Sequence, residues 1–124
     1  MAVVKTTAIT ELGGTLVVDF DADNTVEPNV TGETSGTLYL VEIDNTANST
    51  DRAYLRIKDA ASAPNPADLT PTWMFTAAPG TTASYSMPEG QAYTSGLTMW
   101  CTSNATAQNQ TAPSSAVIVR LIAS

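Results

Sequence analysis

The sequence predicts an all-β fold: a single-domain, jelly-roll-like β-sandwich of about eight strands, spanning residues 1–124. Apolar and polar residues alternate with a period of two along most of the chain. β-Branched residues are frequent, and Gly, Pro, Asn and Ser interrupt the alternation at short intervals. Many short strands separated by closely spaced turns are typical of sandwiches and jelly rolls.

The first three predicted strands are 2–9, 14–20 and 37–45. The first is rich in Val and Thr, and we expect residues 1–13 to form an N-terminal arm or an edge strand. A turn at 11–14 separates it from the second strand, which reads GTLVVDF. The third alternates as TLYLVEIDN and ends at a polar turn.

Five more strands are predicted in the remainder of the chain. Segment 52–59 contains the alternating run AYLRIKD, 72–76 places Trp73 and Phe75 two apart, and 83–87 places Tyr85 and Met87 two apart. Segment 97–103 reads LTMWCTS. The last, 116–122, contains the β-branched run VIVRLI. No helix is predicted, because the alanine-containing stretch 60–67 includes Pro64 and Pro66, which are disfavoured in a helix interior.

Charge and hydropathy narrow the range of partners. The formal net charge is −7, with 12 acidic and 5 basic residues, so we expect neither nucleic acid nor an anionic membrane as a partner. Only 14% of residues are charged, against about 25% in average domains, which favours close packing against other protein. No apolar run approaches the ~20 residues of a membrane span. The N-terminus lacks the features of a signal peptide, so assembly in a cytoplasm is expected.

Cysteine and histidine are scarce. Cys101 is the single cysteine and histidine is absent, which excludes an internal disulfide, Cys/His zinc sites and Ser–His or Cys–His nucleophile pairs. Alternation places Cys101 beside Leu97 and Met99, so we expect it to be a small buried residue. We predict a protein that is not an enzyme, with no catalytic residues, cofactor or metal; the remaining enzymatic alternative is an acid-pair glycosidase.

Three aspartates alternate in the segment VVDFDADN, residues 17–24. A calcium loop starting at Asp19 would need Gly at the position of Asn24 and Glu at the position of Val30, and both fail. As a strand, the segment would place Leu16, Val18, Phe20 and Ala22 on one face, and Val17 with the aspartates on the other. We therefore expect these aspartates on a solvated strand face.

Segments 38–43 and 52–58 are interpreted as a hairpin around the polar turn 44–51. On its second strand, Arg52, Tyr54, Arg56 and Lys58 are expected to point outward. Three interpretations are open: a sugar- or phosphate-binding patch with a stacking tyrosine, cross-strand pairs with the acids Glu42, Asp44 and Asp59, or pairing with an acidic patch on another subunit. The two pairing interpretations are favoured.

The order of several short motifs resembles a small β-sandwich module that is common among structural proteins of tailed bacteriophages. The resemblance covers roughly residues 37–122 and does not include the first thirty-odd residues. It rests on the following stretches: AYLRIKDAASAP (53–64), TPTWMF (70–75), APGTTASY (78–85), PEG (88–90), SGL (95–97), ATA (105–107) and the apolar strand 117–121.

This resemblance implies a virion protein without catalytic residues, most concretely a capsid decoration (cement) protein that bridges neighbouring capsid subunits. The expected partners are the major capsid protein or other virion proteins, and a homo-oligomer, with a trimer favoured. Val3 and Val4 could add an edge strand to a neighbour. The alternatives are a neck, tail or fibre-attachment protein, and a carbohydrate-binding module that uses Tyr54, Trp73 or Trp100.

Overall fold

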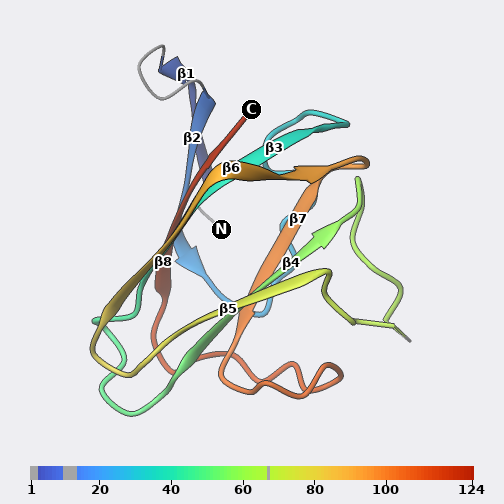
Figure 1. Ribbon diagram of the computed structural model, residues 1–124. Coiled ribbons are helices and arrows are strands. Elements are labelled where there is room, and N and C mark those ends of the chain that lie inside the picture. Colours follow the sequence, from blue (N-terminus) through green and yellow to red (C-terminus); the bar gives the residue numbers. More distant parts are fainter. Residues whose placement is uncertain (1–2, 10–13, 67) are drawn as a thin grey trace.

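The computed structural model describes residues 3–9, 14–66 and 68–124, with the backbone alone for 6–9. These residues form eight strands in two sheets (Figure 1). No helix occurs among them, and so none that could cross a membrane. The strands are β1 (Val3–Ile9), β2 (Gly14–Ala22), β3 (Gly36–Asp44), β4 (Ala53–Asp59), β5 (Trp73–Ala77), β6 (Thr82–Tyr93), β7 (Leu97–Thr102) and β8 (Val117–Ala123).

The strand order is that of a jelly roll. One sheet has the order β1-β2-β8-β3-β6 and the other β5-β4-β7, and every pairing is antiparallel. The segment 23–30 runs along β7: Glu27 exchanges backbone hydrogen bonds with Met99 at 2.8 and 3.0 Å, and the Val30 N–H donates to the Leu97 carbonyl at 2.7 Å. This segment stands where a fourth strand of the second sheet would lie. The predicted all-β sandwich is confirmed.

The core lies between the two sheets and is built from the alternate residues that point inward. In β8 these are Val117, Val119, Leu121 and Ala123, which are fully buried, while the intervening residues are partly exposed. Cys101 is buried among them, and burial raises the pKa of its thiol to about 12, so the prediction of an inert core cysteine is confirmed. Further inward residues are Val17, Leu38, Val41, Ile43, Ala53, Leu55, Ile57, Leu97 and Met99.

The predicted hairpin between the third and fourth strands is wrong. β3 pairs with β6 and β8, whereas β4 belongs to the other sheet and pairs with β5 and β7. The loop between them crosses from one sheet to the other, and buried Asn45 and Asn48 hold it in place. A period of two identifies strands but contains no information about which strands pair. The polar segment 44–51 therefore cannot be distinguished from a hairpin loop by its sequence pattern.

β6 is longer than predicted, since it continues from Thr82 to Tyr93. Leu38 lies opposite Gln91 while Leu40 lies opposite Ser86, so residues 87–90 form an irregularity within the strand. Pro88 and Gly90 lie in it, and Gly90 has φ = +78°, a left-handed conformation that favours glycine. Pro88 is tolerated within the strand because β6 lies at the edge of its sheet.

Candidate subunit interface

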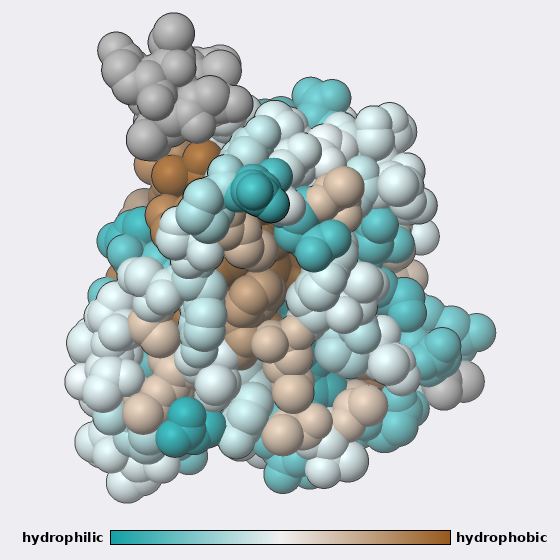
Figure 2. Space-filling view, in the orientation of Figure 1, coloured by the Kyte–Doolittle hydropathy of each residue, from teal (hydrophilic) through white to brown (hydrophobic). Residues whose placement is uncertain are grey.

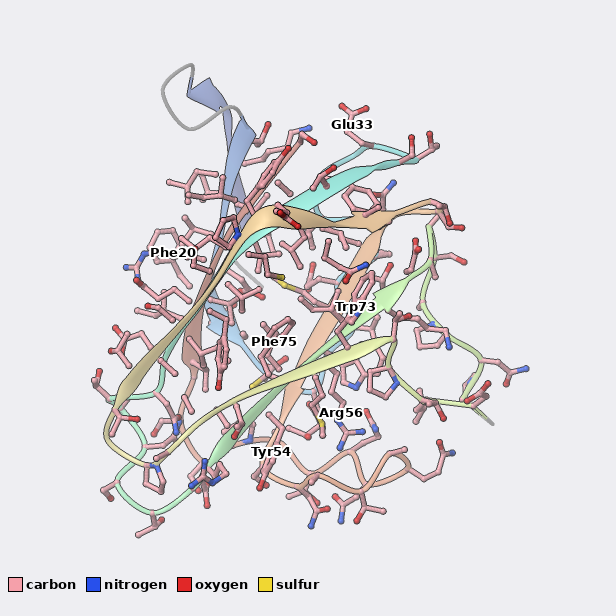
Figure 3. All side chains as sticks on the ribbon, viewed as in Figure 1. Phe20, Glu33, Tyr54, Arg56, Trp73 and Phe75 are labelled. Carbon is pink, nitrogen blue, oxygen red and sulfur yellow. The ribbon has the colours of Figure 1, made fainter. Side chains whose placement is uncertain are left out.

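The outer face of the five-stranded sheet carries apolar side chains on adjacent strands. Val4 lies opposite Val18, and Ile122 lies between Leu16 and Leu40 in the strand register. Val4 and Phe20 are each 48% exposed. Figure 3 places Phe20 outside this sheet, on the side away from Phe75. We define the outer patch as Val4, Leu16, Val18, Phe20, Leu40, Ile118 and Ile122.

The predicted orientation of β2 is wrong. Leu16, Val18 and Phe20, which were expected to face the core, lie on the outer face of the sheet and belong to the outer patch. β2 pairs with β8 so that Val17 lies opposite Leu121 and Asp19 opposite Val119, which turns Val17 and Asp19 inward. A register shift between Asp19 and Ala22 then returns Ala22 to the core. Since both faces of β2 carry apolar residues, alternation alone could not determine which one is buried.

Asp19 is therefore a buried carboxyl rather than part of a solvated face. It is 1% exposed, and its Oδ1 accepts a hydrogen bond from the Asp21 N–H at 3.1 Å. Burial raises the pKa of Asp19 to about 6, and the negative charges of Asp21, Glu27 and Asp23 act in the same direction. Among the described residues, no three potential metal ligands come together around it or elsewhere.

The raised pKa of Asp19 predicts a measurable pH dependence. Between the ordinary value of 3.8 and about 6, the native state keeps a proton that the unfolded state releases, so stability falls as pH rises. Asp19→Asn should flatten this slope and raise the free energy of unfolding at pH 7.5 by about 1–3 kcal/mol. Urea unfolding at pH 4.5 and 7.5 measures the effect.

Exposed Glu33 supplies the control, because Glu33→Gln removes a carboxylate without burial. An unchanged slope in Asp19→Asn would contradict the assignment. Asp44 and Asp51, whose pKa values are lowered by hydrogen bonds from Thr46 and Ser114, contribute below 3.8 and outside this window.

One described ion pair lies beside the outer patch, on the same sheet. Arg120 Nη1 lies 2.8 Å from Glu42 Oε1, and the two residues are opposite each other on β8 and β3. The prediction that Glu42 pairs with a basic residue of segment 52–58 is therefore wrong: Glu42 pairs with Arg120. Asp59 likewise accepts backbone N–H groups of Thr94, Ser95 and Gly96. The paired charges leave the patch near neutrality in a chain of net charge −7.

The six predicted interface residues are divided between the two sheets. Val4 belongs to the outer patch, whereas Val3 packs against the core. Tyr54, Arg56 and Lys58 lie on the outer face of β4, in the other sheet, and Arg52 directly precedes that strand. Arg52 Nη1 donates to Thr76 Oγ1 at 3.4 Å, and Lys58 Nζ donates to the Thr70 carbonyl at 3.0 Å.

Arg56 faces away from the core, as predicted, yet it is fully buried. The connection between β7 and β8 lies over it, and the guanidinium donates hydrogen bonds to four backbone carbonyls of that connection. These acceptors are Asn104, Thr106, Ala107 and Asn109. Arg56 is therefore removed from the set of residues available to a partner.

A second surface lies between the edges of the two sheets, where Trp73 and Phe75 of β5 face Tyr85 and Met87 of β6. All four are partly buried against the core. The rings of Phe75 and Tyr85 are 5.2 Å apart, and the Tyr85 hydroxyl donates to the Thr76 carbonyl. Figure 2 shows an apolar hollow in this region. Trp100, by contrast, is 1% exposed and is not available as a stacking platform.

No protein-family model and no curated protein sequence matches the chain. Among solved structures, the coat protein of Tobacco streak virus is similar over 99% of this chain and 85% of the coat-protein chain, with 13% sequence identity and a TM-score of 0.40. A likeness at this level carries no argument about function. The function is therefore inferred from the residues of the chain and their geometry.

Proposed function

We propose that the protein is a virion structural protein, and specifically a capsid decoration protein that binds the major capsid protein through the outer patch. The observation that carries the proposal is the apolar, nearly neutral outer face of a jelly-roll sheet. Jelly rolls are common in viral capsid domains, although the fold alone does not determine a function. The phage-type motif order of residues 37–122 supports the same assignment.

The outer patch suits repeated attachment better than free solubility. Phe20 and Val4 together expose large apolar side chains beside half-buried Leu16, Ile118 and Ile122. Burying a Phe or Val side chain contributes roughly 1.5–3 kcal/mol. When a homo-oligomer presents several copies of the patch to a lattice, modest contacts combine into strong attachment. A cyclic homo-oligomer, assembled in the host cytoplasm and retained in the virion, meets this requirement.

Imaging of purified particles tests the proposal. Decoration predicts hundreds of copies spread over the shell, whereas a neck, tail or fibre-attachment protein would appear in a few copies on the tail axis. Particles that lack the protein should also rupture at lower temperature or osmotic stress than complete particles. Absence of this protein from purified particles would refute the proposal.

A substitution in the outer patch gives a quantitative prediction. Phe20→Glu should weaken binding of the purified protein to undecorated particles by about 10–100-fold, because a charge replaces the apolar contact. Co-sedimentation with particles at several protein concentrations measures this binding. Met74→Glu is the matched control, since Met74 is 43% exposed on the outer face of the other sheet and should leave binding unchanged. Equal losses in both variants would contradict the assignment of this face.

Carbohydrate binding is the alternative that the hollow between β5 and β6 favours, because Trp73 retains an accessible surface there. Glycan binding that is abolished by Trp73→Ala and retained in Tyr54→Ala would support this alternative.

A further inference from the structure

The two sheets have four edges, and they differ in how readily they could accept another strand. β6 contains Pro88 and the irregularity at 87–90, β5 has only five residues, and β7 is covered by the segment 23–30. Proline, bulges, short length and a covering segment all hinder strand addition. Each of these three edges is therefore protected.

β1 is longer than β5 and contains no proline, and the described ladders place no further strand beside it; its register with β2 shifts once, between Thr6 and Ile9. It is a seven-residue strand, VVKTTAI, without proline or glycine, and in the described ladders it lies at the edge with β2 as its neighbour. Its one charged residue is Lys5, and lysine on an edge commonly discourages pairing. Here, however, Lys5 Nζ donates to the Thr31 carbonyl at 3.1 Å, so the ammonium group is held against the protein. In Figure 1 the β1–β2 hairpin extends beyond the rest of the sandwich.

We propose that β1 pairs with β1 of a second copy of this chain, antiparallel and about a two-fold axis, so that two five-stranded sheets become one continuous sheet. This inference rests on the proposed function, for which it names the contact between copies. An open edge presents backbone N–H and C=O groups that an extended strand satisfies. Two identical edges related by a two-fold axis form an isologous contact, which closes at two copies.

The strand sequence specifies the register of this pair. When all seven residues pair, Thr6 lies on the two-fold axis opposite its own counterpart. Val3 then lies opposite Ile9 of the second copy, Val4 opposite Ala8, and Lys5 opposite Thr7. This register places no two lysines directly opposite each other. It also places Val4 of each outer patch beside the junction between the two sheets, where Lys5 is the one charged residue of each β1 strand.

The choice of a second copy follows from charge as well as from symmetry. The chain has a net charge of −7, so self-association through most of its surface would bring acidic groups together. β1 itself carries a single positive charge, and the charged residues Arg120 and Glu42 beside the outer patch pair with each other. The β1 edge is thus a place where two copies meet at little electrostatic cost. A two-fold pair replaces the trimer expected from the sequence.

Cysteine cross-linking of the full-length protein tests the register. In Thr6→Cys the two introduced thiols would lie on directly opposite residues, with Cα atoms about 4.5–5.5 Å apart, within the range for a disulfide. Mild oxidation should convert this variant to a covalent dimer at least 10-fold faster than Val4→Cys, whose two thiols would be about 13 Å apart along the strands. Cys101 is buried and remains unreactive in both variants.

Sedimentation velocity of the unmodified protein complements the cross-linking. A concentration-dependent dimer, together with the preference for Thr6→Cys, supports the pair; a monomer at all concentrations, a trimer, or equal cross-linking of both variants overturns it. Circular dichroism verifies that each variant keeps its β-sheet signal. Particle imaging separates this inference from the proposed function: a dimer that is absent from particles refutes only the function, and a particle-bound protein without Thr6→Cys cross-links refutes only the pair.

Discussion

Replacing Arg56 with methionine is expected to lower the free energy of unfolding by about 3–5 kcal/mol. The guanidinium is fully buried on the outer face of β4 and donates to the carbonyls of Asn104, Thr106, Ala107 and Asn109. Methionine preserves much of the side-chain length but provides no donor, so these part-buried carbonyls would lose their partner. The connection between β7 and β8 would then lose its attachment to the sheet.

Urea or guanidinium unfolding, followed by tryptophan fluorescence, measures this effect. Arg52→Met provides a matched control directly before the same strand, because Arg52 is exposed and its replacement should change stability by no more than about 0.5 kcal/mol. Arg56→Lys should lie between the two, since an ammonium cannot reproduce the planar fork of five donors. Similar stabilities of Arg56→Met and Arg52→Met would show that the buried hydrogen bonds contribute little.

The second large effect is expected for Asn48→Ala, which should lower the free energy of unfolding by about 2–4 kcal/mol. Asn48 Nδ2 donates to Asn45 Oδ1 at 2.8 Å and to the Ser115 carbonyl at 2.9 Å, and Asn48 Oδ1 accepts the Ser115 N–H at 2.7 Å. The Gly80 N–H donates to the Asn48 backbone carbonyl at 2.7 Å. One buried residue thus joins three connections between strands.

Alanine would leave Oδ1 of buried Asn45, and the part-buried N–H and C=O of Ser115, without these partners. The penalty is larger than the net contribution of the bonds themselves. Thermal and chemical denaturation of the variant measure the loss. Ser49→Ala is the control, because Ser49 is the exposed neighbour in the same loop and should behave as the unmodified protein does. A loss of less than 1 kcal/mol in Asn48→Ala would indicate that water replaces the missing partners.

The sequence was sufficient to identify the strands but not their pairing. All eight predicted segments overlap the observed strands, because alternation and turn residues are local signals. The pairing of β3 with β8 and β6 depends instead on contacts far apart in the chain. A polar loop such as 45–52 has the same composition whether it closes a hairpin or crosses between sheets, which explains the wrong hairpin.

The candidate interface was only partly predictable for a related reason. In β8, the run VIVRLI carries apolar residues at odd and even positions, so the sequence contains a sign that both faces of the strand are largely apolar. The predicted burial of Leu16, Val18 and Phe20 followed from treating one face as solvated. Arg56 was placed on the correct face, but a loop that covers a strand leaves no periodic signal, so its burial could not be anticipated.

The position of β8 has a consequence for the order of folding. This strand lies between β2 and β3 in the middle of the larger sheet, yet it is made after every other strand. Until β8 leaves the ribosome, β2 and β3 cannot occupy their final ladder, and the nascent chain lacks its central partner. Closing such distant pairs is slow. The larger sheet can therefore mature only after β8 has emerged, and until then the polar loops and the excess acidic charge oppose aggregation of the growing polypeptide.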